Sequence, residues 1–205
     1  MARRDSFVVR VQGNPLGSVV SVLARAGDGW TYGDTTVIAG GLVRQQSLIR
    51  VDAALAPRSL TQAVSQQGVN LGAQLTYANG RVTGAANPQP TTPGVVPPPA
   101  QINAAVPAGT VDENQIQMLL PALRLAPGQR LTVNTFSATR NAVVPITLAV
   151  GAAEQVTVPA GTFRAYRVDE TGRQVPTAYY VTADAPYRLV RIAPVGPPFE
   201  IVLAK

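Results

Sequence analysis

The chain has 205 residues, of which 46% are hydrophobic and only 14% are charged. Its 16 Arg and one Lys outweigh 11 carboxylates, which gives a net charge of +6. This length suits a single all-β domain, residues 1–205, that buries a substantial core. The absence of Cys and His excludes disulfides, thiolate or imidazole catalysis, and metal sites built from these ligands.

The basic residues are scattered along the chain, and Arg3-Arg4 is the only adjacent pair. Nucleic-acid binding needs a basic stripe interleaved with stacking aromatic residues, whereas one Arg per strand is typical of a solvated sheet face. We therefore expect no nucleic-acid partner. We also expect no membrane-spanning helix, because the best apolar run, 142–153, is short and contains Pro145.

From Ser6 onward, short apolar runs alternate with turn signals, as in successive antiparallel strands. Asn79-Gly80 is the strongest hairpin signal, because both residues tolerate a positive φ. The strands predicted in this part of the chain are 7–12, 18–25, 30–38, 42–51, 59–66, 70–77 and 81–84.

Residues 87–109 contain seven prolines and no charge. Because proline lacks the N–H donor of a β-ladder, this segment is predicted to be a surface strap with polyproline II character. A short helix is predicted over residues 111–123, with Thr110 or Asp112 as its N-cap and apolar residues at spacings of three and four. Pro121 is expected to bend this helix or to end it early.

After the helix, the strand pattern resumes at 130–137, 143–150, 154–158, 163–169, 177–183, 188–192 and 199–203. Val-Pro-Ala-Gly-Thr occurs twice, at 106–110 and 158–162, and is interpreted as reused turn chemistry because the flanking residues differ. About a dozen strands and one helix favour an all-β fold: a strongly curved antiparallel sheet or incomplete barrel, capped by the helix. Two packed sheets are the alternative.

The C-terminal third contains the most specific motifs. They are the run EQVTVPAGTFRAYRV at 154–168, Tyr-Tyr-Val at 179–181 and APYRLVR at 185–191. These motifs resemble the bacterial envelope family called domain of unknown function 3108. Three earlier segments fall in the order in which that family would place them: 12–17, 55–59 and 109–112. The resemblance implies an exported β-domain akin to the open barrels that shuttle lipoproteins and lipids, and it implies no catalytic or ligand-binding residues.

The first residues favour a location in the periplasm or cell envelope. Met1 to Asp5 lead directly into the strand-like run that starts at Phe7, as expected of a mature domain whose signal peptide has been removed. A cytoplasmic protein with a short basic start is the alternative.

Carboxylate chemistry is the one catalytic route that this composition leaves open, since some glycosidases need only two Asp or Glu residues. Asp169 and Glu170 are neighbours on a predicted strand and should point to opposite faces. Asp112 and Glu113 are better explained as residues that cap a helix. We therefore expect no enzyme activity and no cofactor.

Two binding functions are consistent with the sequence. In the first, the curved sheet holds a hydrophobic small molecule, a lipid or a lipoprotein tail, and Trp30, Tyr32 and Tyr179 are candidates to line its cavity. Tyr187 and Phe199 belong to the same aromatic set, although aromatic residues on strands more often pack in a core. In the second, the chain is a structural accessory subunit docked on a larger envelope or membrane protein complex. The candidate contact residues for that role are Val95, Val96, Pro97 and Pro98, a preformed docking segment.

Overall fold

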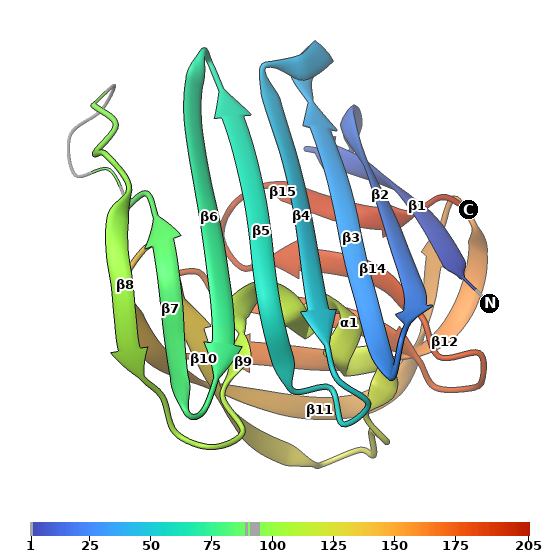
Figure 1. Ribbon diagram of the computed structural model, residues 1–205. Helices are drawn as coiled ribbons and strands as arrows, with labels where there is room; N and C mark the ends of the chain where they lie inside the picture. Colours follow the sequence, from blue (N-terminus) through green and yellow to red (C-terminus); the bar gives the residue numbers. More distant parts are fainter. Residues whose placement is uncertain (1, 89, 91–94) are drawn as a thin grey trace.

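The computed structural model describes residues 2–88, 90 and 95–205. These residues form one continuous 15-stranded sheet (Figure 1). In chain order the strands are β1 (Arg3–Val11), β2 (Asn14–Ala26), β3 (Gly29–Ile38), β4 (Val43–Val51), β5 (Pro57–Gln66), β6 (Val69–Ala78), β7 (Arg81–Ala86), β8 (Ala100–Ala105), β9 (Val111–Asp112), β10 (Arg130–Ser137), β11 (Ala142–Val158), β12 (Gly161–Thr171), β13 (Thr177–Thr182), β14 (Leu189–Pro194) and β15 (Phe199–Leu203).

The order of the strands across the sheet is β8-β7-β6-β5-β4-β3-β2-β1-β15-β14-β13-β12-β11-β10-β9. All neighbouring strands are antiparallel except β9 and β10, which are parallel. The first and last strands pair with each other near the middle, where Phe7 lies opposite Leu203. The sheet therefore has an N-terminal half, β1–β8, and a C-terminal half, β9–β15, joined along the β1–β15 pair.

The sheet is bent so strongly that its two halves face each other. Figure 1 shows β3–β8 running upright, with β10, β11, β14 and β15 crossing behind them. A short helical segment lies in the space between the halves, and it comprises η2 (Glu113–Gln115), α1 (Ile116–Leu119) and η3 (Leu120–Ala122). The prediction of a curved, incompletely closed antiparallel sheet with one short helix is confirmed, and the alternative of two packed sheets is wrong.

Alternating side chains explain why the sheet has a buried concave face. On β1, Phe7 and Val9 are buried, whereas Val8 between them and Ser6 and Arg10 on either side are partly exposed. Buried side chains form three clusters, and the helical segment contributes Met118 to one of them and Ile116 and Leu120 to another. None of the described helices is long and apolar enough to span a bilayer.

The predicted helix over 111–123 is shorter than expected. Val111 and Asp112 belong to strand β9, and helical backbone begins only at Glu113. Asp112 has an extended backbone and its side chain accepts a hydrogen bond from the Asn114 amide, so it is the N-cap. Pro121 lies in the final 3-10 turn, and the segment ends at Ala122.

The predicted strap over 87–109 is also shorter than expected. Residues 100–105 form β8, which pairs with β7 from Ala86↔Ala100 to Arg81↔Ala105. This stretch contains no proline, so every residue keeps its N–H donor and a ladder can form. Residues 95–99 have no regular secondary structure, and the parts of the predicted strap at 89 and 91–94 lie outside the described residues.

Local turn signals predicted several connections correctly. Asn79 and Gly80 have φ values of 51° and 69° and connect β6 to β7, as expected for the hairpin.

The two predicted strands 143–150 and 154–158 form the single long strand β11, because the break between them is a bulge between Val150 and Ala153.

Candidate functional site

A cleft lies between the concave face of β5–β7 and the start of the helical segment. Its volume is about 320 Å³, at the lower end of the range for small-molecule pockets. The residues that line it are Gln62, Val64, Leu71, Gly72, Ala73, Ala86, Asn87, Pro88, Pro90, Glu113, Ser137, Thr139, Arg140, Val144 and Arg173. The cleft therefore draws on both halves of the sheet.

One wall of the cleft is mainly apolar and comes from the N-terminal half. Val64 and Leu71 are cross-strand partners on β5 and β6, and Ala73 and Ala86 are partners on β6 and β7. Alternation along each strand places all four side chains on the same face of the sheet. Val64 and Leu71 remain partly exposed, so an apolar surface is available inside the cleft.

The opposite wall is polar and comes from the C-terminal half. Ser137 Oγ donates to Glu113 Oε1 at 3.0 Å, and Arg173 Nη2 donates to the Glu113 backbone carbonyl at 3.1 Å. Arg140 is exposed in the turn between β10 and β11. Burial raises the pKa of Glu113 above its ordinary value, despite the hydrogen bond from Ser137. Arg173 is ion-paired with Glu170, so the exposed guanidinium of Arg140 is the group on this wall that favours an anionic ligand in the cleft.

A row of polar side chains leads across the concave face to the cleft. Asp5, Ser21, Asp34, Ser47 and Gln62 lie on five consecutive strands, and each is the cross-strand partner of the next. Ser47 hydrogen-bonds to Asp34, and burial raises the pKa of Asp34 above its ordinary value. Gln62 ends the row inside the cleft.

A fully buried carboxyl lies beside the cleft, at the start of the helical segment. Tyr77 Oη donates to Asp112 Oδ2 at 2.5 Å, and the Asn114 amide donates to Asp112 Oδ1 at 2.8 Å. Burial raises the pKa of Asp112, and these hydrogen bonds oppose the shift. Burial, with the neighbouring Asp112 charge, raises the pKa of Tyr77 as well. Tyr77 therefore stays a neutral phenol that donates a hydrogen bond, and the buried Asp112 carboxyl accepts it.

Glu170 is another carboxyl that is almost completely buried, with 1% of its surface exposed. Arg173 Nε lies 2.9 Å from Glu170 Oε1, and Tyr179 Oη donates to Glu170 Oε2 at 3.1 Å. Asp169, its neighbour on β12, forms an exposed ion pair with Arg167 instead. The two carboxylates point to opposite faces, as expected, and Glu170 anchors the arginine that borders the cleft.

The three aromatic residues predicted to line a ligand cavity lie in two different core clusters, with Trp30 and Tyr32 in one and Tyr179 in the other. Tyr32 is buried in the cluster under the N-terminal half, and its hydroxyl donates to Gln117 Oε1 at 3.1 Å. Tyr179 is buried in the cluster around Ile116 and Leu120. Trp30 is partly buried beneath the Arg25 guanidinium, which lies 4.9 Å from the ring centroid. None of the three lines the cleft.

The predicted partner-contact residues lie in the connection between β7 and β8. Val95 is 57% exposed and Pro98 is exposed, whereas Val96 and Pro97 are partly buried. Asn87 Nδ2 donates to the Pro97 carbonyl at 2.9 Å and holds this connection against the end of β7.

Sequence reasoning missed the cleft residues Gln62, Arg140 and Arg173. Gln62 could have been identified from the sequence, because it is a polar residue at a position that alternation assigns to the buried face of β5. Arg140 and Arg173 lie in turns, and only the bending of the sheet brings them opposite β5–β7. Glu113 was identified correctly as a residue at the helix start, but its position in a cleft was not.

The fold and the cleft define an all-β protein built on a single open, strongly curved sheet, with a two-walled cleft between the halves of that sheet. The family described as "Protein of unknown function (DUF3108)" matches residues 6–203, and the chain belongs to this family. No curated protein and no solved structure matches the chain.

Proposed function

We propose that this chain is a non-catalytic binding domain of the cell envelope, and that its cleft holds a hydrophobic ligand with an anionic end. The observation that carries the proposal is the contrast between the two walls of the cleft. Val64 and Leu71 offer an apolar surface, and the opposite wall carries the exposed guanidinium of Arg140. Arg173 lies on the same wall, where Glu170 offsets its charge. A lipid or a lipoprotein tail has this combination of an acyl chain and an acidic group.

The ligand is expected to enter only part of the way between the halves of the sheet. Leu75, Met118 and Phe136 are almost completely buried and fill the interior next to the cleft. A volume of about 320 Å³ accommodates a short part of an acyl chain, and the remainder would extend out of the open end. The envelope location belongs to the proposal and follows the expectation drawn from the sequence.

The experiment is a titration with dansyl-labelled undecanoic acid, followed by fluorescence. Val64→Trp fills the apolar wall and should weaken binding at least tenfold, whereas Ala63→Trp changes the neighbouring residue on the opposite face and should not. Arg140→Glu should also weaken binding, because it places a negative charge at the anionic end. Equal affinity in the Val64 and Ala63 variants, or no binding by the parent protein, would contradict the proposal. Thermal unfolding shows whether each variant is folded.

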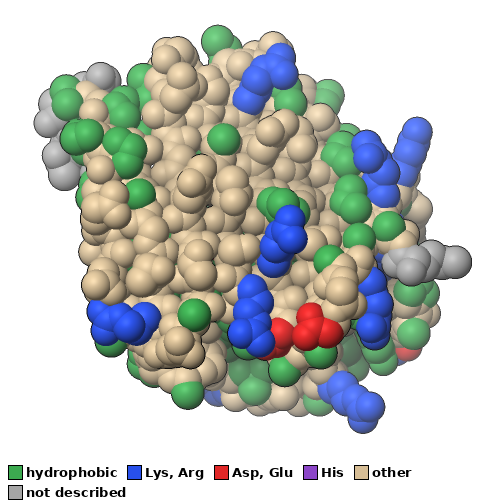
Figure 2. Space-filling model, viewed as in Figure 1, with side chains coloured by type: hydrophobic (Ala, Val, Ile, Leu, Met, Phe, Trp, Pro, Cys, Tyr) green, Lys and Arg blue, Asp and Glu red, His purple; other side chains and the backbone are tan. Residues whose placement is uncertain are grey.

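A structural accessory subunit is the second candidate function. The face of β2–β8 shown in Figure 2 is largely neutral, and its outward strand positions carry arginines, such as Arg44, Arg50 and Arg81, but no carboxylate in the described residues. Leu48 and Val95 are exposed hydrophobic residues of this half. A surface of this kind suits docking on a protein partner. Chemical crosslinking in native cells should then recover a stoichiometric complex that Leu48→Arg or Val95→Asp disrupts.

A further inference from the structure

A second pocket lies where the chain leaves the helical segment. Leu123, Arg124 and Leu125 form one side of it, and Tyr166, Val181, Thr182, Ala183 and Tyr187 form the other. Its volume is about 420 Å³, and it shares no lining residue with the cleft described above. The two hollows lie near opposite ends of the helical segment, because Glu113 borders the cleft and Leu123 borders this pocket.

The lining of this pocket combines aromatic and aliphatic surface with a single charge. Tyr166 and Tyr187 contribute two rings, and Arg124 is the one charged residue of the lining. Arg124 belongs to none of the ion pairs found among the described residues. An unpaired guanidinium with no carboxylate beside it in the lining favours an anionic ligand.

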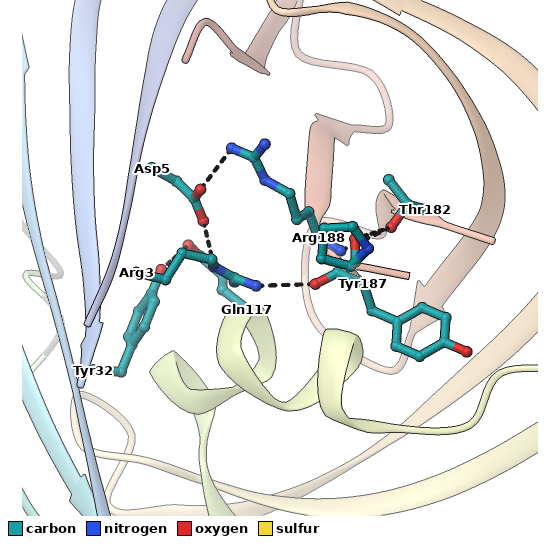
Figure 3. A network of polar contacts seen from close by, with 8 residues as sticks. Arg3, Asp5, Tyr32, Gln117, Thr182, Tyr187 and Arg188 are labelled. Carbon is teal, nitrogen blue, oxygen red and sulfur yellow. Dashed lines mark hydrogen bonds and ion pairs between the residues drawn. The ribbon is translucent and has the colours of Figure 1, made fainter. Parts of the chain in front are cut away.

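The wall that carries Tyr187 is held by an ion-pair network centred on the buried Asp5 (Figure 3). Asp5 is 4% exposed, and its carboxylate oxygens lie 2.7 Å from Arg188 Nη2 and 2.9 Å from Arg3 Nε. Arg3 Nη1 also donates to the Tyr187 backbone carbonyl at 2.9 Å. The network therefore ties the connection between β13 and β14 to strand β1.

Thr182 stabilises the connection between β13 and β14 through two hydrogen bonds to its backbone. Its hydroxyl donates to the Pro186 carbonyl at 3.0 Å and accepts a hydrogen bond from the Arg188 amide at 2.9 Å. These contacts fix the backbone on both sides of Tyr187, whose ring points away from the network in Figure 3 and is 48% exposed. A ring held open on a fixed backbone needs little reorganisation to bind a ligand.

We propose that this pocket is a second binding site, which takes a small aromatic carboxylate. The aromatic ring of the ligand packs against Tyr166 and Tyr187, since aromatic pairs gain more than their buried area alone provides. Leu123, Leu125 and Val181 supply the surrounding apolar surface, and Arg124 pairs with the carboxylate. This site is independent of the ligand proposed for the cleft.

The test is an NMR titration of the 15N-labelled protein with 3-phenylpropionate. We expect amide shifts concentrated at residues 123–125 and 181–187, and unchanged binding in the Val64→Trp variant of the cleft. Arg124→Gln should weaken binding about tenfold, as expected for the loss of a charged hydrogen bond. Arg130→Gln, which changes another exposed arginine outside the pocket, is the matched control.

Two further ligands test the chemical class. The uncharged 3-phenylpropionamide should bind at least fivefold more weakly than the acid, and Tyr187→Ala should reduce the affinity for the acid. If 3-cyclohexylpropionate binds as tightly as 3-phenylpropionate, the site does not select aromatic rings and that part of the proposal fails. If no shifts occur at millimolar ligand, or if Arg124→Gln and Arg130→Gln bind equally well, the site itself is overturned. Both arginines are exposed, so these variants should fold normally, which the reference NMR spectrum shows directly.

Discussion

Asp112 connects the two halves of the molecule through a single side chain. It accepts hydrogen bonds from Tyr77 on β6 and from both the amide and the side chain of Asn114. These three donors offset the cost of burying a carboxyl that is 0% exposed. Asp112 therefore both caps the helical segment and fixes it against the N-terminal half, beside the cleft.

Tyr77→Phe is expected to lower the free energy of unfolding by about 1–3 kcal/mol, because the buried Asp112 carboxyl loses a donor. The phenyl ring keeps its edge-to-face contact with Phe136, so the effect isolates the hydroxyl. Urea unfolding measures the change. Tyr187→Phe removes a phenol from a side chain that is 48% exposed and should change stability by less than about 0.5 kcal/mol. Similar effects of the two substitutions would contradict this role of Asp112.

Stability is expected to rise as the pH falls from 7 to 5. Burial raises the pKa values of Asp34, Asp112, Glu113 and Glu170, so the folded state binds protons at a higher pH than the unfolded state does. The free-energy cost of burying these carboxyls in the charged form is therefore largest above their raised pKa values. It disappears as the pH falls towards the pKa values of the same carboxyls in the unfolded chain. Urea unfolding at several pH values measures the slope.

Glu113→Gln identifies the contribution of the cleft to this pH dependence. The variant has no carboxyl to neutralise at this position, so its stability should change less between pH 7 and pH 5 than that of the parent protein. Glu154→Gln changes an exposed glutamate of β11 and serves as the control. An unchanged slope in the Glu113 variant would show that this carboxyl titrates normally in the folded state.

Among the strands, β8 is the one at the N-terminal edge of the sheet, and it carries no charge of its own. Arg81, on the neighbouring strand β7, reaches across it. Its guanidinium donates to Asn103 Oδ1 at 3.0 Å from Nε and to the Asn103 backbone carbonyl at 3.1 Å from Nη2. A positive charge held against an edge strand obstructs pairing with a strand of another molecule.

Arg81→Ala should therefore increase the self-association of the protein at high concentration. Sedimentation velocity over a concentration series measures the dimer fraction. Arg50→Ala removes the same charge from β4, which has a paired strand on both sides, and should leave the protein as monomeric as before. If both variants associate equally, the effect is one of net charge and Arg81 does not protect the edge.

At the scale of the whole molecule, the two halves of the sheet depend on the β1–β15 pair. The buried Leu203 lies opposite Phe7 in this pair, and both belong to one core cluster. We expect one cooperative unfolding transition, reported equally by the fluorescence of Trp30, the single Trp in the N-terminal half, and by the circular dichroism of all strands.

Leu203→Ala should lower the free energy of unfolding by about 2–5 kcal/mol and shift both signals together. Phe199→Ala, at the 36% exposed start of the same strand, is the control and should cost less. Separate transitions for the two signals would show that the halves unfold independently.

Local patterns were sufficient to predict much of this fold. Alternation predicted most strands, and the Asn79-Gly80 pair predicted its hairpin, because both depend on residues close together in the chain. The proline content of 87–109 led to a wrong prediction for β8, since the prolines lie outside the six residues that form the strand. The high proline content of the whole segment masked residues 100–105, which contain no proline and can pair with β7.

The cleft could not be predicted from the sequence for a different reason. Its apolar wall depends on the register of β5–β7, and its polar wall depends on turns at Arg140 and Arg173 that are distant in the chain. Tyr77 and Asp112 likewise meet only after the sheet has bent. A polar residue at a core-facing strand position, Gln62, was the one local sign of this site in the sequence.

The pairing of β1 with β15 has a consequence for how the protein is made. On the ribosome, β1 is synthesised before the other strands of the sheet and β15 after them, so one edge of β1 has no partner until β15 has been translated. Contacts between such distant residues slow folding and leave strand edges open to aggregation in the meantime. Biosynthesis of this protein should therefore depend on chaperones that shield the N-terminal strands until β15 arrives.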